Sequence, residues 1–276
     1  GLVFVTSILA DRLLLSRIHT LESVGLYSIA FKVAGLLMLL VGWFSLSWHP
    51  FAFKSFYENE NHPQIFKKIL NYVLMFFGFL ALGLTVFSPE ILKIFTTPSY
   101  FGAYTAVGPL TLSIVALAII PIVSFSLEAK KISRYALPVS LAATILNIVL
   151  NLLLIPRWNI LGAGIATAIS QAMLAAMWYT LTHRITKLWQ FDTKKVLSIS
   201  VLLVAYIAGT YFLNPYHSLY IIPIKLFYLL SFPAILYLFG AFSPSEIIWM
   251  KSVMSKKYIR ENIIGHIKYF TNIKND

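Results

Sequence analysis

The stretch NIVLNLLLIPRWNILGAGIATAISQ, residues 147–171, decides the fold. It predicts the end of one apolar helix, a short corner and the start of a second helix. Asn147 and Asn151 are four residues apart, so they share one face of the first helix. That helix stops at Pro156, and the arginine and tryptophan that follow suit a membrane interface. The second helix opens with glycine, alanine and threonine, which let a neighbouring backbone approach closely in lipid. The stretch therefore predicts a transmembrane hairpin with polar side chains.

The composition indicates an integral membrane protein. Of the 276 residues, 59% are hydrophobic and 12% are charged, whereas a soluble domain has about 25% charged residues. The apolar residues occur in runs of about 20, which favours helices over a transmembrane β-barrel. The net charge of +12 is explained by basic cytoplasmic loops rather than by nucleic-acid binding. The absence of cysteine excludes disulfides, thiolate metal sites and thiol catalysis.

Eight apolar spans are each close to the length that crosses about 30 Å of hydrocarbon. We predict them at residues 1–18, 25–48, 68–88, 104–127, 135–155, 161–182, 195–213 and 219–240. The first span has only ten residues before Asp11 and does not begin with Met. We therefore expect its true start to lie upstream, and the chain to be a fragment.

The distribution of basic residues predicts the orientation. If the spans alternate, sixteen lysine and arginine residues fall on the side that holds the C-terminal tail and four on the other side. The positive-inside rule makes the richer side cytoplasmic. The tail, residues 241–276, opens with the capping-box spacing Ser243-Pro244-Ser245-Glu246. We expect a basic amphipathic helix on an anionic leaflet, the alternative being a disordered, solubilising tail.

Three charged residues inside the spans are candidate functional residues: Asp11, Arg12 and Lys32. Asp11 and Lys32 flank the first corner at similar distances, which places both roughly 10 Å deep at a rise of 1.5 Å per residue. In one interpretation they form a structural ion pair while Arg12 snorkels outward. In the other, Arg12 and Lys32 face an aqueous cavity as a cationic site for a phosphate group, and Asp11 orients them.

The uncharged polar residues in the spans also allow two interpretations. Asn147 and Asn151 could bind sugar hydroxyls or bond to a neighbouring helix, and the second interpretation is favoured. The same two interpretations apply to Thr167 and Gln171, and bonding to a neighbouring helix is again favoured. Lys225, near the start of the last span, is expected to snorkel to the interface.

Enzymatic function lacks the necessary residues. A membrane glycosyltransferase or polymerase would need acidic or histidine-rich outer loops, and the longest outer loop, about residues 88–103, offers only Glu90. Glu58, Glu60 and His62 on the cytoplasmic side are weak evidence for a metal site. No P-loop or dinucleotide fingerprint occurs. We therefore predict a protein that is not an enzyme and has no cofactor and no metal.

Several short motifs resemble one family. They are Asp11-Arg12, Val24-Gly25-Leu26-Tyr27-Ser28 with Lys32, Trp48-His49-Pro50, Ser99-Tyr100, Lys130-Lys131, Asn147 with Asn151, Ile155-Pro156, and Gly162-Ala163 with Ala166-Thr167. With these motifs the chain resembles the polysaccharide (O-antigen type) flippases of the multidrug, oligosaccharidyl-lipid and polysaccharide exporter superfamily. One departure is Asn159, where the family usually has Gly, although Asn tolerates left-handed backbone.

The resemblance implies an all-α membrane protein of fourteen helices, arranged as two six-helix lobes around a cavity and two extra helices. Residues 1–184 would be the second lobe, residues 195–240 the extra pair, and the first lobe would be missing. The implied function is export of an undecaprenyl-diphosphate-linked oligosaccharide across the bacterial plasma membrane by alternating access. Membrane lipids and the missing N-terminal lobe are the other expected partners, and nucleic acid is not one.

The resemblance also sets the expected site and its competitors. Asp11, Arg12, Lys32, Asn147 and Asn151 would line the cavity. A drug or organic-cation exporter of the same superfamily would need cavity carboxylates, and only Asp11 is available. A membrane glycosyltransferase or polymerase and a purely structural membrane scaffold are the remaining alternatives.

Overall fold

The structure, a computed structural model, describes residues 2–132, 134–186, 191–214 and 219–238. The chain divides into two units, Gly1–Phe232 and Pro233–Asp276. Of the second unit, the described part is the end of one helix, up to Leu238. The predicted cytoplasmic tail, residues 241–276, lies outside the described residues.

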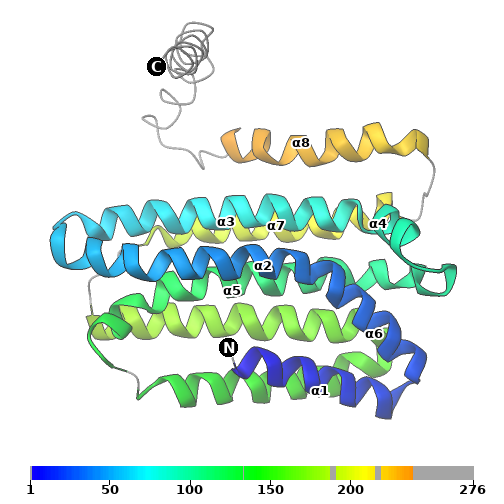
Figure 1. Cartoon of the computed structure of the whole chain (residues 1–276), viewed down its shortest axis with the longest axis horizontal. Coiled ribbons are helices and arrows are strands. Elements are labelled where there is room, and N and C mark those ends of the chain that lie inside the picture. The colour runs from blue at the N-terminus through cyan, green and yellow to red at the C-terminus, as the bar shows by residue number, and fades with distance from the viewer. Residues whose placement is uncertain (1, 133, 187–190, 215–218, 239–276) are drawn as a thin grey trace, which may run out of the picture. The chain divides into compact units, whose positions relative to one another are not determined.

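Every regular element in the described ranges is helical, which confirms the predicted all-α class (Figure 1). The α-helices are α1 (Leu2–Ile18), α2 (Leu21–Glu58), α3 (His62–Val86), α4 (Ser88–Phe95), α5 (Tyr104–Ala129), α6 (Ala136–Thr186), α7 (Thr193–Leu213) and α8 (Ile222–Leu238). Two 3₁₀ segments, Pro98–Ala103 and Leu219–Ile221, precede α5 and α8.

Each of the eight predicted spans coincides with a helix or half of one. The fifth and sixth spans are the two halves of α6, which bends sharply at Asn159 (φ 48°, ψ −129°). Five helical stretches are long and apolar enough to cross a membrane, namely α2, α3, Pro98–Ala129, α6 and α7. α1 and α8 have 17 residues each, which is at the lower limit of about 17–25 residues for a span. The chain is a multi-pass membrane protein.

Several helices extend beyond their predicted bounds. α2 begins at Leu21, where the Thr20 side chain caps its amino end, and it continues through Pro50 to Glu58. α3 begins at His62, with a proline in its first turn, a position where the missing N–H costs nothing. The short helix α4 was not predicted. It begins with Ser88-Pro89-Glu90 and brings Glu90 back towards the membrane-spanning helices.

Packing in the first unit is centred on α5, which contacts α2, α3 and α6, while α1 packs on α6 and α3 on α7. The predicted small-residue face of α6 closely approaches α5. A Cβ atom at Gly164 would lie 3.2 Å from Pro109 Cβ and 3.4 Å from the Ala106 carbonyl oxygen of α5. Small side chains therefore allow α6 to pack tightly where lipid provides no hydrophobic drive.

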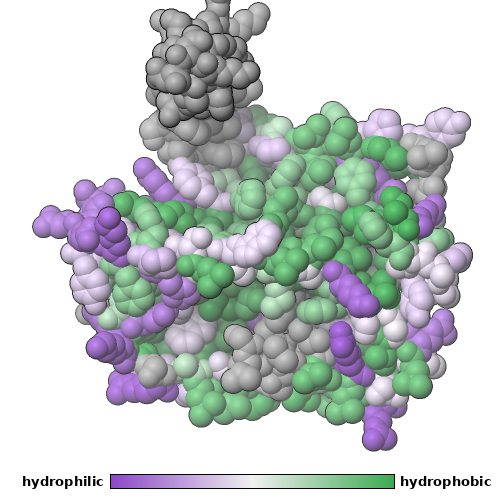
Figure 2. All heavy atoms as spheres, in the orientation of Figure 1, coloured by the Kyte–Doolittle hydropathy of each residue, from purple (hydrophilic) through white to green (hydrophobic). Residues whose placement is uncertain are grey.

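The outer surface is apolar along the helices. On the face that Figure 2 shows, hydrophobic side chains cover the middle of the surface and hydrophilic ones gather towards the helix ends. Trp43 of α2, Ile145 of α6 and Val201 of α7 are among the large hydrophobic side chains that are exposed. So much exposed apolar surface suits contact with lipid.

Candidate functional site

A polar network surrounds Asp11 in the middle of α1, and its carboxylate is fully buried. Asp11 Oδ2 accepts hydrogen bonds from Tyr27 Oη at 2.5 Å and from Thr167 Oγ1 at 2.7 Å. Asp11 Oδ1 accepts one from Asn151 Nδ2 at 2.5 Å. Three donors from three helical segments therefore converge on one carboxylate.

Asn147 completes this network, which we call the Asp11 network (Asp11, Tyr27, Asn147, Asn151 and Thr167). Its Nδ2 donates to Thr167 Oγ1 at 3.3 Å, and its Oδ1 accepts from Asn151 Nδ2 at 3.2 Å. All five residues are buried. The network joins α1, α2 and both halves of α6.

The bend in α6 creates this geometry. The positive φ of Asn159 turns the second half of α6 back along the first, so that Thr167 comes to lie opposite Asn147. Gly162 is necessary for the close approach, since a Cβ atom there would overlap the Leu154 carbonyl group. A second contact holds α1 to the same corner, because His19 Nε2 lies 3.0 Å from the Ile155 carbonyl oxygen.

The predicted Asp11 to Lys32 ion pair is wrong. Lys32 is exposed, and the described residues place no cation within 4.0 Å of the Asp11 carboxylate. The reason is rotation about α2, where Tyr27 faces Asp11. Lys32 follows five residues later, which turns it about 140° away at 100° per residue. The similar depths of Asp11 and Lys32 in the membrane were therefore not enough to predict an ion pair, because they do not show which way each side chain points.

Arg12 lies outside the Asp11 network. It is partly buried, and its guanidinium carbon lies 6.0 Å from the ring centre of Phe31, the residue before Lys32. Its Nε is buried without a hydrogen-bond partner. The structure thus divides the five candidate residues. Asp11, Asn147 and Asn151 come together, whereas Arg12 and Lys32 do not join them.

The favoured interpretation of the two asparagines, hydrogen bonding between helices, agrees with the structure. The partners of Asp11 were not predicted. Tyr27 was noted only as part of a motif, and Thr167 was expected, like the asparagines, to bond to a neighbouring helix, without Asp11 as its named partner. Their one signal in the sequence is that both place a hydroxyl within an otherwise apolar run. A contribution of any of these residues to substrate binding stays a prediction.

The Asp11 network can also be considered as an ion site. An ionised carboxylate inside a membrane helix is costly unless its charge is balanced. Hydroxyl oxygens surround Asp11, and the Asn151 Oδ1 is buried without a partner. The two hydroxyls and the Asn151 amide nitrogen, however, donate to the carboxylate, so hydrogen bonds and not a bound cation stabilise Asp11 in this structure. Among the described residues, no group of three or more His, Asp or Glu side chains could hold a metal ion.

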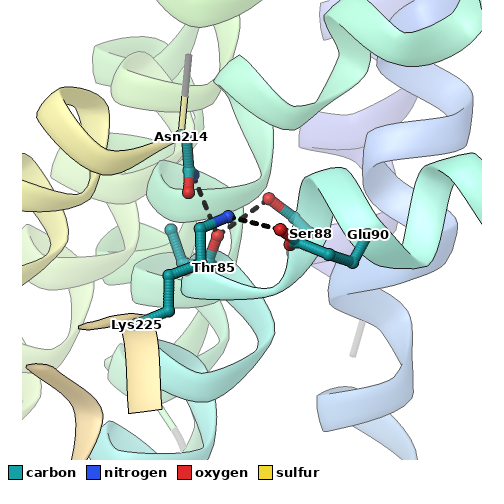
Figure 3. Close-up of polar contacts among 5 residues, drawn as sticks. All are labelled: Thr85, Ser88, Glu90, Asn214 and Lys225. Atoms are coloured by element: carbon teal, nitrogen blue, oxygen red, sulfur yellow. Dashed lines mark hydrogen bonds and ion pairs between the residues drawn. The ribbon is translucent and has the colours of Figure 1, made fainter. Parts of the chain in front are cut away.

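A second buried charge contradicts the prediction for Lys225. Lys225 does not snorkel but is fully buried, and its Nζ lies 2.7 Å from Glu90 Oε1 (Figure 3). The short helix α4, which was not predicted, supplies this carboxylate.

Comparison with known proteins identifies the fold. No family model matches the sequence, and no curated protein matches it. Among solved structures, the chain is similar to the lipid II flippase MurJ in an inward closed conformation, with a TM-score of 0.53 and 19% sequence identity. The fold is MurJ-like. The match covers 82% of this chain and 52% of the MurJ chain, so the chain spans about half the length of the flippase it resembles.

Proposed function

We propose that this chain is the second lobe and the two extra helices of a transporter that flips a lipid-diphosphate-linked oligosaccharide across the bacterial plasma membrane. Residues 1–184 form the lobe, residues 195–240 form the extra pair, and the tail is cytoplasmic. The product serves O-antigen or surface polysaccharide synthesis, and transport proceeds by alternating access. The observation that carries the proposal is the MurJ-like fold.

The diphosphate group of the proposed substrate is consistent with two positively charged side chains in the lobe. A diphosphate with several sugars crosses hydrocarbon only along a polar, shielded path. Arg12 and Lys32 are outside the Asp11 network and have no ion-pair partner among the described residues. They are the cations that would contact the diphosphate. The Asp11 network would hold α1 and α6 in place behind them.

The burial of Asp11 argues against the organic-cation exporter. Such a transporter needs a carboxylate that its substrate can reach. Asp11 is fully buried, and both of its oxygens accept hydrogen bonds from protein donors. An anionic substrate that binds to Arg12 and Lys32 is therefore favoured over a cationic one.

Flipping of a fluorescent lipid-diphosphate oligosaccharide in proteoliposomes tests this proposal. We expect transport when the chain is present with a first lobe encoded upstream, and none from the chain alone. In the two-lobe protein, Arg12→Gln and Lys32→Gln should each slow flipping, whereas Lys54→Gln, an exposed cation paired with Glu58, should not. Robust flipping by the chain alone, or transport of organic cations by the two-lobe protein, would contradict it.

A further inference from the structure

The Lys225 ammonium occupies an acceptor-rich site outside the Asp11 network (Figure 3). Lys225 is 0% exposed, and the one ion pair that it makes with a described residue is with Glu90 Oε1 at 2.7 Å. Glu90 Oε2 is buried without a partner. An ammonium group has three donors, so this site offers it more acceptor capacity than one salt bridge uses.

The ends of two helices form the rest of this site. Thr85, at the carboxyl end of α3, has a carbonyl oxygen that accepts from Ser88 Oγ at 2.8 Å and from Asn214 Nδ2 at 3.1 Å. Asn214 follows the last residue of α7 and is 1% exposed. Its Oδ1 has no partner. Figure 3 shows the amide group on the same side of Thr85 as the Lys225 ammonium.

The electrostatics of this site favour a cation. The carboxyl ends of α3 and α7 meet here, and each carries the negative end of a helix dipole. Glu90 adds a full negative charge. Lys225 itself lies in the first turn of α8, where the positive end of its own helix opposes an ammonium group. Glu90 and the carboxyl ends of α3 and α7, and not the dipole of α8, therefore explain why the Lys225 ammonium group is buried here.

The Lys225–Glu90 ion pair is important because α8 makes few other polar contacts with described residues. Lys225 is the one charged residue of α8. Among the described residues, two other polar contacts join α8 to another helix of the first unit. They are the bond from Tyr228 Oη to the Tyr206 carbonyl at 2.7 Å and a 2.8 Å contact between Tyr206 Oη and Ser231 Oγ. In lipid, apolar contact adds little to helix association, so polar bonds and close packing hold helices together.

We propose that Glu90 and Asn214, the latter positioned by Thr85, form a binding site for a primary ammonium group, that Lys225 fills this site, and that its capture holds residues 222–232 of α8 against the rest of the first unit. The cation that occupies the site is therefore a side chain of α8, the helix that the site holds in place. Its ligand class is a primary amine, because Glu90 Oε1 accepts from the Lys225 ammonium at 2.7 Å and two further buried oxygens, Glu90 Oε2 and Asn214 Oδ1, are without partners. This inference does not depend on the proposed transport function.

Distance measurements between two spin labels test the proposal. The chain has no cysteine, so cysteines introduced at Phe76 of α3 and Phe227 of α8, both exposed, would be the only labelling sites. We expect one narrow distance in the otherwise unchanged chain and its loss in Lys225→Ala. Millimolar methylammonium should restore the narrow distance in that variant. Tetramethylammonium, which has no N–H donor, should not.

Two further variants keep the proposal falsifiable. Lys225→Met fills the space of the lysine stem, so it should lose the narrow distance and show no recovery with methylammonium. Glu90→Gln should lose the narrow distance without recovery, and it provides the test if Lys225→Ala does not fold. A narrow distance retained in Lys225→Ala or in Glu90→Gln would overturn the proposal. Recovery of Lys225→Met, or equal recovery of Lys225→Ala with both ammonium salts, would also overturn it.

Discussion

Thr167 Oγ1 donates a 2.7 Å hydrogen bond to Asp11 Oδ2 and so joins α1 to the second half of α6, 156 positions away in the chain. Thr167 also accepts from Asn147. One hydroxyl therefore holds the carboxylate and an amide together, and the stability of the lobe should depend on it.

Thr167→Val should lower the free energy of unfolding in detergent by about 1–3 kcal/mol, because a buried carboxylate loses a donor that nothing replaces. Thr180→Val is the matched control. Thr180 is exposed, and its one bond to a described residue is to the Ala176 carbonyl of its own helix. Thr180→Val should therefore lower the free energy of unfolding by no more than about 0.5 kcal/mol. Equal losses in the two variants would show that the Asp11 network does not stabilise the lobe.

Asp11→Asn should also destabilise the protein, because the amide NH₂ group would replace one carboxylate oxygen and face either the Asn151 amide or the Tyr27 and Thr167 hydroxyls as donors. A double-mutant cycle with Thr167→Val should give a coupling energy of about 0.5–3 kcal/mol, as expected for residues in one hydrogen-bonded network. If the two losses of unfolding free energy simply add, Asp11 and Thr167 do not interact, which would contradict the network.

Lys32→Gln should leave the unfolding free energy within about 0.5 kcal/mol of the original value, because Lys32 is exposed and makes no ion pair with Asp11. In the two-lobe transporter the same change should slow flipping at constant protein level. Immunoblotting and the proteoliposome assay measure the two quantities separately. A fall in protein level that accounts for the lost flipping would give Lys32 a structural role instead.

Asn159→Gly should raise the unfolding free energy by about 1 kcal/mol, because residues other than glycine are strained at such dihedral angles. Asn159 has φ 48° and ψ −129°, so its ψ differs from that of the left-handed helical region that Asn tolerates. Its Oδ1 is buried without a partner, so little is lost with the side chain. Asn61→Gly is the control. Asn61 has φ −86° and makes no capping bond, so that variant should show no gain.

Gly162→Ala should lower the unfolding free energy by about 1–3 kcal/mol, as expected when a rigid neighbour must move. The neighbour is the Leu154 backbone, which a new Cβ atom would overlap. Gly42 of α2 has nothing within 4 Å of its Cβ position. Gly42→Ala should therefore be neutral or stabilising by about 0.5–1 kcal/mol. Similar effects of the two substitutions would mean that the bend in α6 tolerates a side chain.

The number of apolar helical segments among the described residues, their approximate bounds and the hairpin at residues 147–171 followed from the sequence alone. Apolar length and the positions of proline and glycine are local properties, and in a membrane they largely decide where helices lie. The small-residue face of α6 was predictable for the same reason, because close helix packing in lipid requires small side chains.

The partners of the buried charges were decided only by the tertiary structure. Residue counts set the depth of Asp11 and Lys32, but the rotation of α2 about its axis turned Tyr27 towards the carboxylate and Lys32 away from it. Lys225 similarly contacts Glu90 because α4 places this carboxylate beside the first turn of α8. Helix rotation and the course of a short loop helix depend on packing against distant segments, which no local pattern in the sequence records.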